Sequence, residues 1–308
     1  MKHFKLEGEI LTRELEFPEG PIAMPDGSVV VVEIMGGRLA RVQPDGVVSI
    51  VAELGGGPNG AAIGPDGNCY VCNNGGFSWR TDNGFSRPTG VPDDYQGGSI
   101  QRVNLDSGAV EVLYTHYEGI PLHGPNDIVF DDNGGFWFTD FGKKFDDKLM
   151  HGFLYYAKAD GSEIRCLAKH LLTPNGVGLS PDGKTVYVSE TESSRLWRFP
   201  VIGEGKVSLQ AWPSPNGGEF LYGSSGYQRF DSLAVEECGN VCVATLVNGG
   251  ISVISPEGEL LEFYEAPEGY CTNICFGGKD RRTAYITLSG YGHLMAVEWP
   301  RPGLKLAN

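Results

Sequence analysis

The feature that most constrains this chain is an internal repeat of six segments in one frame. Each segment begins with a polar residue, passes through small or apolar residues and ends in a turn. The six are "EGPIAMPDG" from Glu19, "NGAAIGPDG" from Asn59, "NDIVFDDNG" from Asn126, "NGVGLSPDG" from Asn175, "DSLAVEECG" from Asp231 and "TNICFGGKD" from Thr272. In the first five, a glycine stands eight positions after the first residue. A repeat of this kind indicates one supersecondary unit used several times.

Each segment is followed by runs that are typical of β-strands. A run rich in β-branched and aromatic residues comes first, such as "SVVVVE" or "GFWFTD", and an alternating run such as "GRLARVQPDG" follows. A fourth run closes five of the units, among them "VVSIVAE", "AVEVLYT" and "KVSLQAW". Six units of four strands predict an all-β fold, a six-bladed β-propeller with four-stranded antiparallel blades.

The two ends of the chain complement each other. The sixth unit runs out of chain at "RPGLKLAN", whereas the N-terminal "LEGEILTRE" precedes the first inner strand without a partner of its own. We therefore expect the N-terminal strand to complete the last blade and remove an exposed edge. No run predicts a long helix or a linker, so residues 1–308 are expected to form a single propeller domain.

The repeat predicts a ring of polar side chains at one mouth of the central channel. Asparagine and aspartate are poor strand formers, yet Asn126 and Asp127 open a strand. In a propeller the inner strands begin at the same mouth, so the six first residues lie around one centre. They are Glu19, Asn59, Asn126, Asn175, Asp231 and Thr272.

This ring favours a hard cation. Two converging carboxylates repel each other unless a cation lies between them. Carboxylate and amide oxygens indicate Ca²⁺ first, with Mg²⁺, Mn²⁺ or Zn²⁺ as alternatives. We expect one divalent cation per chain.

Charge and cysteine content exclude several classes. With 24 Lys and Arg against 39 Asp and Glu, the net charge of −15 argues against nucleic acid and anionic membrane as partners. No apolar run approaches the ~18 residues of a membrane span, and "MKHFKLEGEILTRE" has no apolar signal segment. Cys69 and Cys72 lie in a strand-like run and are interpreted as reduced core residues of a cytoplasmic protein.

Four motifs in order carry a family resemblance over essentially the whole chain. They are Glu19-Gly-Pro, Pro125-Asn126-Asp127 followed by "FTD", Pro174-Asn175-Gly176, and Asp231. This set resembles the gluconolactonase, regucalcin (senescence marker protein) and luciferin-regenerating enzyme family, and is similar also to diisopropyl fluorophosphatase.

The resemblance implies roles for particular residues. It implies metal ligation by Glu19, Asn175 and Asp231, with Asn126 as a further ligand or substrate contact. Asp127 would not bind the metal itself but would hold a ligand residue or a water in position. Ala234 stands where the fluorophosphatase has an aspartate of a second calcium site, so no second calcium is expected.

Two long segments near the mouth are candidates for the substrate pocket. Residues 73–98 are too long for a blade turn and are predicted to form a long loop that covers the metal as a lid. Residues 141–152 form a second long loop. The candidate substrate-binding residues are Asn59, Phe77, Trp79, Arg80, His123 and Asn126.

Together these observations predict a metal-dependent lactone hydrolase of the gluconolactonase type, whose partner is a small-molecule lactone. Asp231 would act as general base for an attacking water, or in a covalent variant attack the substrate directly. Two alternatives use the same cation: an organophosphate (phosphotriester) hydrolase, and a non-catalytic calcium-binding propeller. A condensing enzyme similar to strictosidine synthase would need no metal, and the ring disfavours it.

Overall fold

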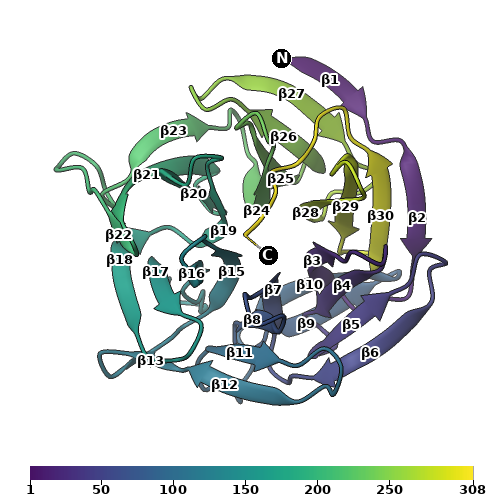
Figure 1. Ribbon diagram of the computed structural model, residues 1–308, viewed down its shortest axis with the longest axis horizontal. Helices are drawn as coiled ribbons and strands as arrows, with labels where there is room; N and C mark the ends of the chain where they lie inside the picture. The colour runs from purple at the N-terminus through teal and green to yellow at the C-terminus, as the bar shows by residue number, and fades with distance from the viewer. Residues whose placement is uncertain (308) are drawn as a thin grey trace.

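The computed structural model describes residues 1–307 as six antiparallel sheets arranged around a central axis (Figure 1). No α-helix occurs in these residues, and hence none that is long and apolar enough to cross a bilayer. The expected all-β six-bladed propeller is therefore confirmed. The six innermost strands contact their neighbours all the way round the ring.

The first three blades follow the expected order from the axis outward. Blade one contains β3 (Pro18–Ala23), β4 (Val29–Glu33), β5 (Arg38–Val42) and β6 (Val48–Glu53). Blade two contains β7 (Pro58–Ile63), β8 (Cys69–Asn73), β11 (Ser99–Val103) and β12 (Val110–Tyr114). Blade three contains β15 (Pro125–Phe130), β16 (Gly135–Asp140), β17 (Gly152–Lys158) and β18 (Ile164–Leu171).

The last three blades complete the ring. Blade four contains β19 (Pro174–Leu179), β20 (Thr185–Glu190), β21 (Arg195–Gly203) and β23 (Glu219–Gly223), with β22 (Lys206–Val207) on the end of β21. Blade five contains β24 (Arg229–Val235), β25 (Val241–Leu246), β26 (Gly250–Ile254) and β27 (Leu260–Glu265). Blade six contains β28 (Cys271–Gly277), β29 (Thr283–Leu288) and β30 (His293–Glu298).

The N-terminal segment closes the ring, as expected, and also adds a strand to a second blade. β2 (Gly8–Thr12) pairs antiparallel with β30 as the fourth strand of blade six. β1 (Lys2–Lys5), which the repeat did not predict, pairs parallel with β27 as a fifth strand of blade five. The first twelve residues therefore join blades five and six. Leu6, which lies between β1 and β2, is buried in the apolar core between these two blades.

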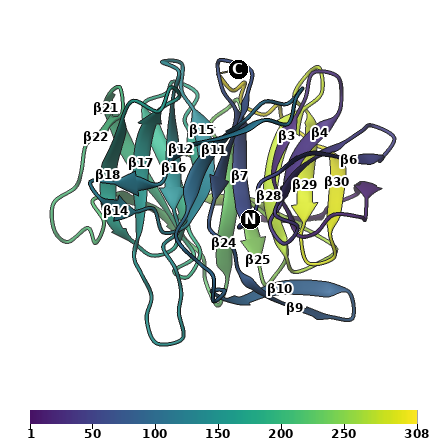
Figure 2. The same ribbon diagram turned by 90° about the horizontal axis from the view of Figure 1, so that it is seen from below.

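Two short hairpins interrupt the repeat. β9 (Ser78–Asp82) pairs with β10 (Phe85–Gly90), and β13 (His116–Tyr117) pairs with β14 (Ile120–Pro121). The prediction of a loop without strands over residues 73–98 was thus wrong in form. The alternation of "FSWRTDNGFSRPTG", with Asn83-Gly84 at its centre, is a hairpin signal. Figure 2 shows this hairpin at one end of the ring axis.

Six apolar clusters fill the six interfaces between neighbouring blades. The interface between blades one and two, for example, buries Val30, Val32 and Leu39 against Val71 and Val103. All seven cysteines within residues 1–307 are free, and Cys69 and Cys72 are buried, in agreement with their interpretation as reduced core residues. The alternate apolar residues of each strand thus explain why the blades stack face to face.

Blade four departs from the predicted strand assignment. "KVSLQAW" was expected to be its outer strand, but only Lys206 and Val207 form a strand, and they pair with the protruding end of β21. The outer position belongs to β23, which pairs with residues 195–198 of β21. β21 is nine residues long, and its last residues extend past the blade. The tight turn at residues 203–205 pairs β22 with this extension, so the outer edge of the blade is free for β23.

Deleting residues 1–14 should destabilise the protein far more than removing residues 304–308. The N-terminal deletion removes two paired strands and the burial of Leu6, a loss of a few kcal/mol that lowers Tm by roughly 5–15 °C. Among the described residues 304–307, the C-terminal deletion removes one backbone hydrogen bond, from Leu304 N to Val235 O at 2.8 Å, and the packing of Leu304. Calorimetry on both truncations checks this, and equal shifts would mean that ring closure contributes little.

Candidate functional site

Each inner strand begins with an irregularity at the channel mouth. The strand pairing shifts register between Glu19 and Ile22, between Pro125 and Ile128, and between Pro174 and Val177. The inner strands of blades two, five and six show the same shift. Such irregularities re-aim side chains next to functional sites. They lie at the first residues of the six repeated segments, which are the predicted ring positions.

Glycines let neighbouring inner strands approach closely at this level. A Cβ on Gly20 would lie 2.7 Å from Asn59 O, and a Cβ on Gly60 would lie 2.4 Å from Asn126 O. A Cβ on Gly176 would lie 2.6 Å from Leu233 N. Distances this short exclude a side chain, so the residue that follows the ring position in these segments must be glycine for the ring to be narrow.

Hydroxyl groups bond to the backbone of the neighbouring blade at or beside three of the ring positions. Thr139 of β16 donates to Asn175 O at 2.5 Å, and Ser189 of β20 donates to Asp231 O at 2.6 Å. Ser289, after β29, donates to Pro18 O at 2.5 Å, next to Glu19. These bonds fix the backbone of the ring residues, so their side chains are positioned by two blades rather than one.

The carboxylates of the ring interact with one another. Burial raises the pKa of Glu19 well above its ordinary value, and the nearby Asp231 raises it further. Burial also raises the pKa of Asp231 to about 7, and the charge of Asp127 adds to this rise. Three carboxyl groups from blades one, three and five thus lie close enough to repel, and an added positive charge would relieve that repulsion.

Two ring oxygens lack any hydrogen-bond partner. Glu19 is 2% exposed and its Oε2 accepts from Gly20 N and from Asn273 Nδ2, while its Oε1 accepts from nothing. The Oδ1 atom of Asn126, which is 4% exposed, is also without a partner. Buried oxygens that lack donors are costly unless a cation or water satisfies them.

The donor set fits a hard cation. Asn175 donates from Nδ2 to Thr191 Oγ1 at 3.1 Å, and its Oδ1 accepts from Ser232 Oγ at 3.2 Å, which leaves one lone pair of that oxygen free. Within residues 1–307 no three His, Cys, Asp or Glu side chains form a metal-binding group. A cation at the mouth would therefore be held by the two carboxylates together with amide oxygens, which suits Ca²⁺ rather than a soft metal.

Blade six contributes differently from the prediction. Thr272 is buried at the expected place, but its hydroxyl bonds to Thr287 Oγ1 at 2.8 Å and to Ser289. The side chain that reaches the ring is Asn273, whose Nδ2 donates to Glu19 Oε2 at 2.6 Å. Asn273 occupies the second position of its repeated segment, as Asp127 does in blade three. This shared position was the sequence feature that could have identified Asn273 as a residue of the site.

Asp127 lies behind the ring. Its Oδ2 accepts from Val177 N at 3.2 Å and its Oδ1 from Ile128 N at 3.0 Å, so it ties blade three to the strand that carries Asn175. Burial raises its pKa to about 7. These contacts hold the strand that carries Asn175 against blade three.

Arg229 was not anticipated. It precedes Asp231 by two residues on β24, and its charge lowers the pKa of that carboxyl, against the effect of burial. Its guanidinium pairs with Glu192 at 2.7 Å, and its buried Nε has no partner. The residue carried no repeat signal, because blade-equivalent positions in the other segments are not basic.

The β9–β10 hairpin extends from blade two to blades one and six on the ring's side of the molecule. Ser86 N donates to Gly290 O at 2.8 Å, and Phe85 packs edge-on against Tyr270 and Tyr291 with ring centroids 5.1 and 5.0 Å apart. Trp79 contacts Phe17, two residues before Glu19, at 4.8 Å. The hairpin thus lies along the rim from which the ring residues start.

The remaining predicted substrate residues differ in their surroundings. Asn59 is buried in the ring, and Phe77 lies 6.0 Å from Trp79 at the base of the hairpin. Arg80 is largely exposed and pairs with Asp82 at 2.7 Å, so it does not join this group. His123 is held by its backbone, since its N–H donates to Asp140 Oδ2 at 2.7 Å, and its buried Nδ1 has no partner.

The second long segment, residues 141–152, supports the hairpin base through Lys143. Its side chain is 1% exposed, donates from Nζ to Gly76 O at 2.8 Å, and lies 4.3 and 4.8 Å from the ring centroids of Phe77 and Tyr95. Burial lowers the pKa of Lys143 to about 7. A lysine here clamps the base of the hairpin from the neighbouring blade.

Replacing Lys143 with methionine should remove a pH dependence of stability. Between about pH 7 and 10 the unfolded chain keeps a proton on this lysine that the folded chain has lost, because its unfolded pKa is about 10.4. The free energy of unfolding of the parent protein therefore rises with pH in that window, by at most about 1.4 kcal/mol per pH unit. Urea unfolding at pH 7, 8 and 9 checks this, and parallel slopes in both proteins would contradict it.

Fold and site together define a class: six-bladed propellers with a ring of carboxylates and amides at one mouth of the axial channel. The family model described as SMP-30/Gluconolactonase/LRE-like region matches residues 17–290. The chain belongs to this family, as the motifs indicated.

Two similar proteins are a lactonase and a gluconolactonase. Lactonase drp35 of Staphylococcus saprophyticus is 29% identical over 234 residues, which is 75% of this chain and 64% of that protein. The gluconolactonase of Zymomonas mobilis is 24% identical in an alignment 305 residues long that covers 91% of this chain and 78% of that protein. The match to drp35 therefore spans less than two thirds of that relative's length.

Solved structures agree in fold. Regucalcin of Agrobacterium tumefaciens, a calcium-binding protein, superimposes with a TM-score of 0.76 at 18% identity, over 99% of this chain and all of that one. A gluconolactonase from Xanthomonas campestris superimposes with a TM-score of 0.72 at 23% identity, over 94% of this chain and 88% of that one. At these identities the likeness concerns the propeller itself.

Proposed function

We propose that this protein is a metal-dependent lactone hydrolase that opens a cyclic ester at the channel mouth. The observation that carries the proposal is the convergence of Glu19 and Asp231, buried carboxylates that repel each other, with orphaned oxygens on Glu19 and Asn126. A scaffold has no need of such an arrangement. The similarity to a lactonase and to a gluconolactonase independently supports hydrolysis of a lactone.

Four residues would hold the cation: Glu19, Asn126, Asn175 and Asp231. The first and last supply charge, and the asparagines supply neutral oxygens, a set that ranks Ca²⁺ first among Ca²⁺, Mg²⁺, Mn²⁺ and Zn²⁺. When bound, such a cation would polarise the carbonyl oxygen of a lactone and lower the pKa of a nearby water.

The chain's own residues supply the proton transfers and the orientation. Asp231 accepts a proton from the water that attacks the carbonyl carbon, and returns it to the ring oxygen as the carbon–oxygen bond of the ester breaks. Lactone and water thereby become a hydroxy acid. The charge of Arg229 favours the ionised form of Asp231, and Asp127 holds the strand of Asn175 in place. A direct attack by Asp231 would form an acyl-enzyme instead.

The aromatic side chains of the hairpin would form one wall of the substrate site. Phe77 and Trp79 contact each other near Phe17, and these rings suit a lactone with an apolar face. Asn59 and His123 would supply polar contacts from blades two and three. Arg80, whose charge is paired with Asp82, would contact only a substrate that extends to the tip of the hairpin.

The activity test is a comparison of hydrolysis rates on sugar, aliphatic and aromatic lactones, with and without a chelator. We expect turnover that a chelator abolishes and added Ca²⁺, Mg²⁺ or Mn²⁺ restores. Including a phosphotriester separates an organophosphate hydrolase from a lactonase. Calcium binding without turnover of any of these compounds would instead identify a non-catalytic calcium-binding propeller.

A further inference from the structure

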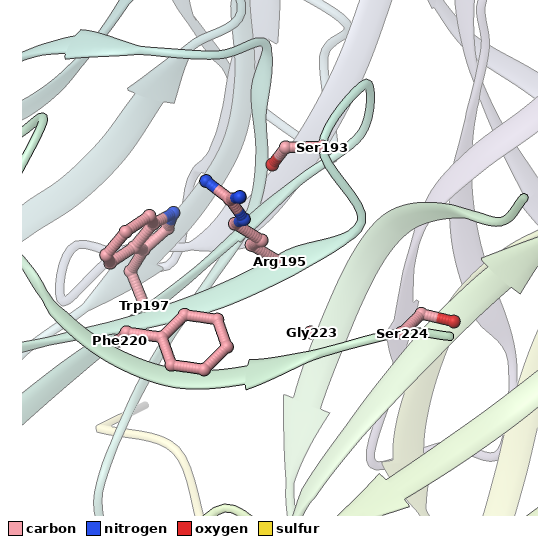
Figure 3. A pocket seen from close by; sticks show the side chains of 6 residues that line it. All are labelled: Ser193, Arg195, Trp197, Phe220, Gly223 and Ser224. Carbon is pink, nitrogen blue, oxygen red and sulfur yellow. The ribbon is translucent and has the colours of Figure 1, made fainter. Parts of the chain in front are cut away.

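A cavity of about 560 Å³ lies on blade four, lined by none of the ring residues. Figure 3 shows the six residues that line it: Ser193, Arg195, Trp197, Phe220, Gly223 and Ser224. All come from the end of the β20–β21 turn, from β21 or from β23 and its end. It is a recess that stands wide open to solvent, not an enclosed chamber.

Two hydrogen-bond donors in this cavity have no acceptor. The indole of Trp197 is 4% exposed, and its Nε1 has no hydrogen-bond partner. In Figure 3 that nitrogen lies on the side of the indole that faces the guanidinium of Arg195. The two residues are two apart on β21 and so share one face of the strand. Arg195 is exposed and takes part in none of the ion pairs found within residues 1–307, so it is free to turn toward a ligand.

The cavity offers a positive charge and no carboxylate. Its two hydroxyl groups are engaged as donors: Ser193 donates to Glu190 Oε2 at 2.5 Å, and Ser224 donates to Ser225 O at 3.3 Å. The lining residues include no Asp or Glu, although the chain as a whole carries a charge of −15. An anion is therefore the complement of this surface, and a planar carboxylate matches the fork of a guanidinium.

An aromatic wall stands beside the donors. Phe220, opposite Trp197 on β23, is 58% exposed and meets that indole edge-on, with centroids 5.8 Å apart. Gly223 pairs with Arg195, and the Phe220 ring lies directly over it, since a Cβ on Gly223 would come within 3.2 Å of Phe220 Cζ. A flat apolar group could rest on the Phe220 ring.

We propose that blade four carries a second ligand site, which binds a small organic carboxylate with a flat apolar body. The carboxylate pairs with Arg195 and accepts from the Trp197 indole N–H. The apolar body rests on the exposed face of the Phe220 ring. The site is independent of the lactone chemistry at the channel mouth.

Calorimetric titration of the full chain with benzoate tests the proposal. We expect saturable binding of one benzoate per chain. Arg195→Gln should weaken it by about tenfold or more, because it removes a charge-assisted hydrogen bond. Trp197→Phe should weaken it while keeping an aromatic ring, and Gly223→Val should abolish it by filling the cavity. Acetate, which lacks the ring, and benzyl alcohol, which lacks the charge, should bind far more weakly.

The matched control is Arg198→Gln. It removes the same charge from the same strand, but Arg198 pairs with Glu219 at 2.8 Å and does not line the cavity, so benzoate affinity should change less than about twofold. Asp231→Asn should leave benzoate binding intact, which separates this site from the channel mouth. Absence of saturable benzoate binding, or equal affinity in the parent, Arg195→Gln and Gly223→Val proteins, would overturn the proposal.

Discussion

Replacing Asp231 with asparagine is expected to lower kcat for lactone hydrolysis by roughly 10²–10⁴-fold, the contribution of a positioned general base. The substitution keeps the size of the side chain but removes the group that accepts the proton of water. It also removes one of the two carboxylates that would neutralise the cation, so the affinity for Ca²⁺ should fall as well. Steady-state kinetics at saturating Ca²⁺ separates the loss of the base from the loss of the metal.

Asp127→Asn provides the comparison for this variant. Asp127 is a buried carboxylate of similar pKa, but it binds the backbone of Val177 and Ile128. An asparagine can still accept the Val177 bond, so kcat should fall by only about 10–100-fold, as for groups that position a ligand. If Asp127→Asn proves the more damaging of the two at saturating Ca²⁺, the role of base belongs to Asp127.

Removing the β9–β10 hairpin should raise KM for bulky aromatic lactones by about tenfold or more and leave small sugar lactones far less affected. Ser78 and Gly90 are paired across the base of the hairpin, so residues 79–89 can be replaced by an Asn-Gly turn without moving the flanking strands. The deletion spares Phe77 and the Lys143 clamp, but removes Trp79 and Phe85.

The Phe85→Ala variant is a milder change that tests the same role of the hairpin. It releases the hairpin from Tyr270 and Tyr291 while leaving Trp79 present, so its effect on KM should be smaller and in the same direction. Calcium affinity should be unchanged in both variants, because no cation ligand lies in the hairpin. Equal losses on every lactone together with loss of the metal would show that the hairpin is structural.

The fold could be predicted because the repeat appears six times in the sequence. One polar residue followed by small residues, a turn and three further runs defines a blade, and the orphan "LEGEILTRE" identified the closing strand. The parallel pairing of β1 with blade five could not be predicted in this way, because "KHFK" has no equivalent in the other units. The same is true of β23, since the choice between two possible outer strands depends on the length of β21.

The ring positions also follow from the repeat, but their partners do not. Asn273, Thr139 and Ser189 act across blade boundaries, so their contacts depend on how neighbouring blades approach each other in space. Arg229 and Lys143 lie outside the repeated frame, and their importance becomes visible only from burial and from the groups they face. Asn83-Gly84 is a hairpin signal that the sequence contains. The prediction missed it because the length of residues 73–98 was taken to indicate a loop without strands.

We expect the channel mouth to hold one divalent cation between Glu19, Asn126, Asn175 and Asp231. Anomalous diffraction from a crystal soaked in Mn²⁺, a stand-in for Ca²⁺ with a usable anomalous signal, tests it most directly. We expect one strong peak on the propeller axis, within coordination distance of the Glu19 and Asp231 carboxylates, and its loss in a Glu19→Gln, Asp231→Asn double variant that still folds. A mouth without a peak in the parent protein, at a concentration of Mn²⁺ that supports hydrolysis, would show that these four residues do not bind the cation.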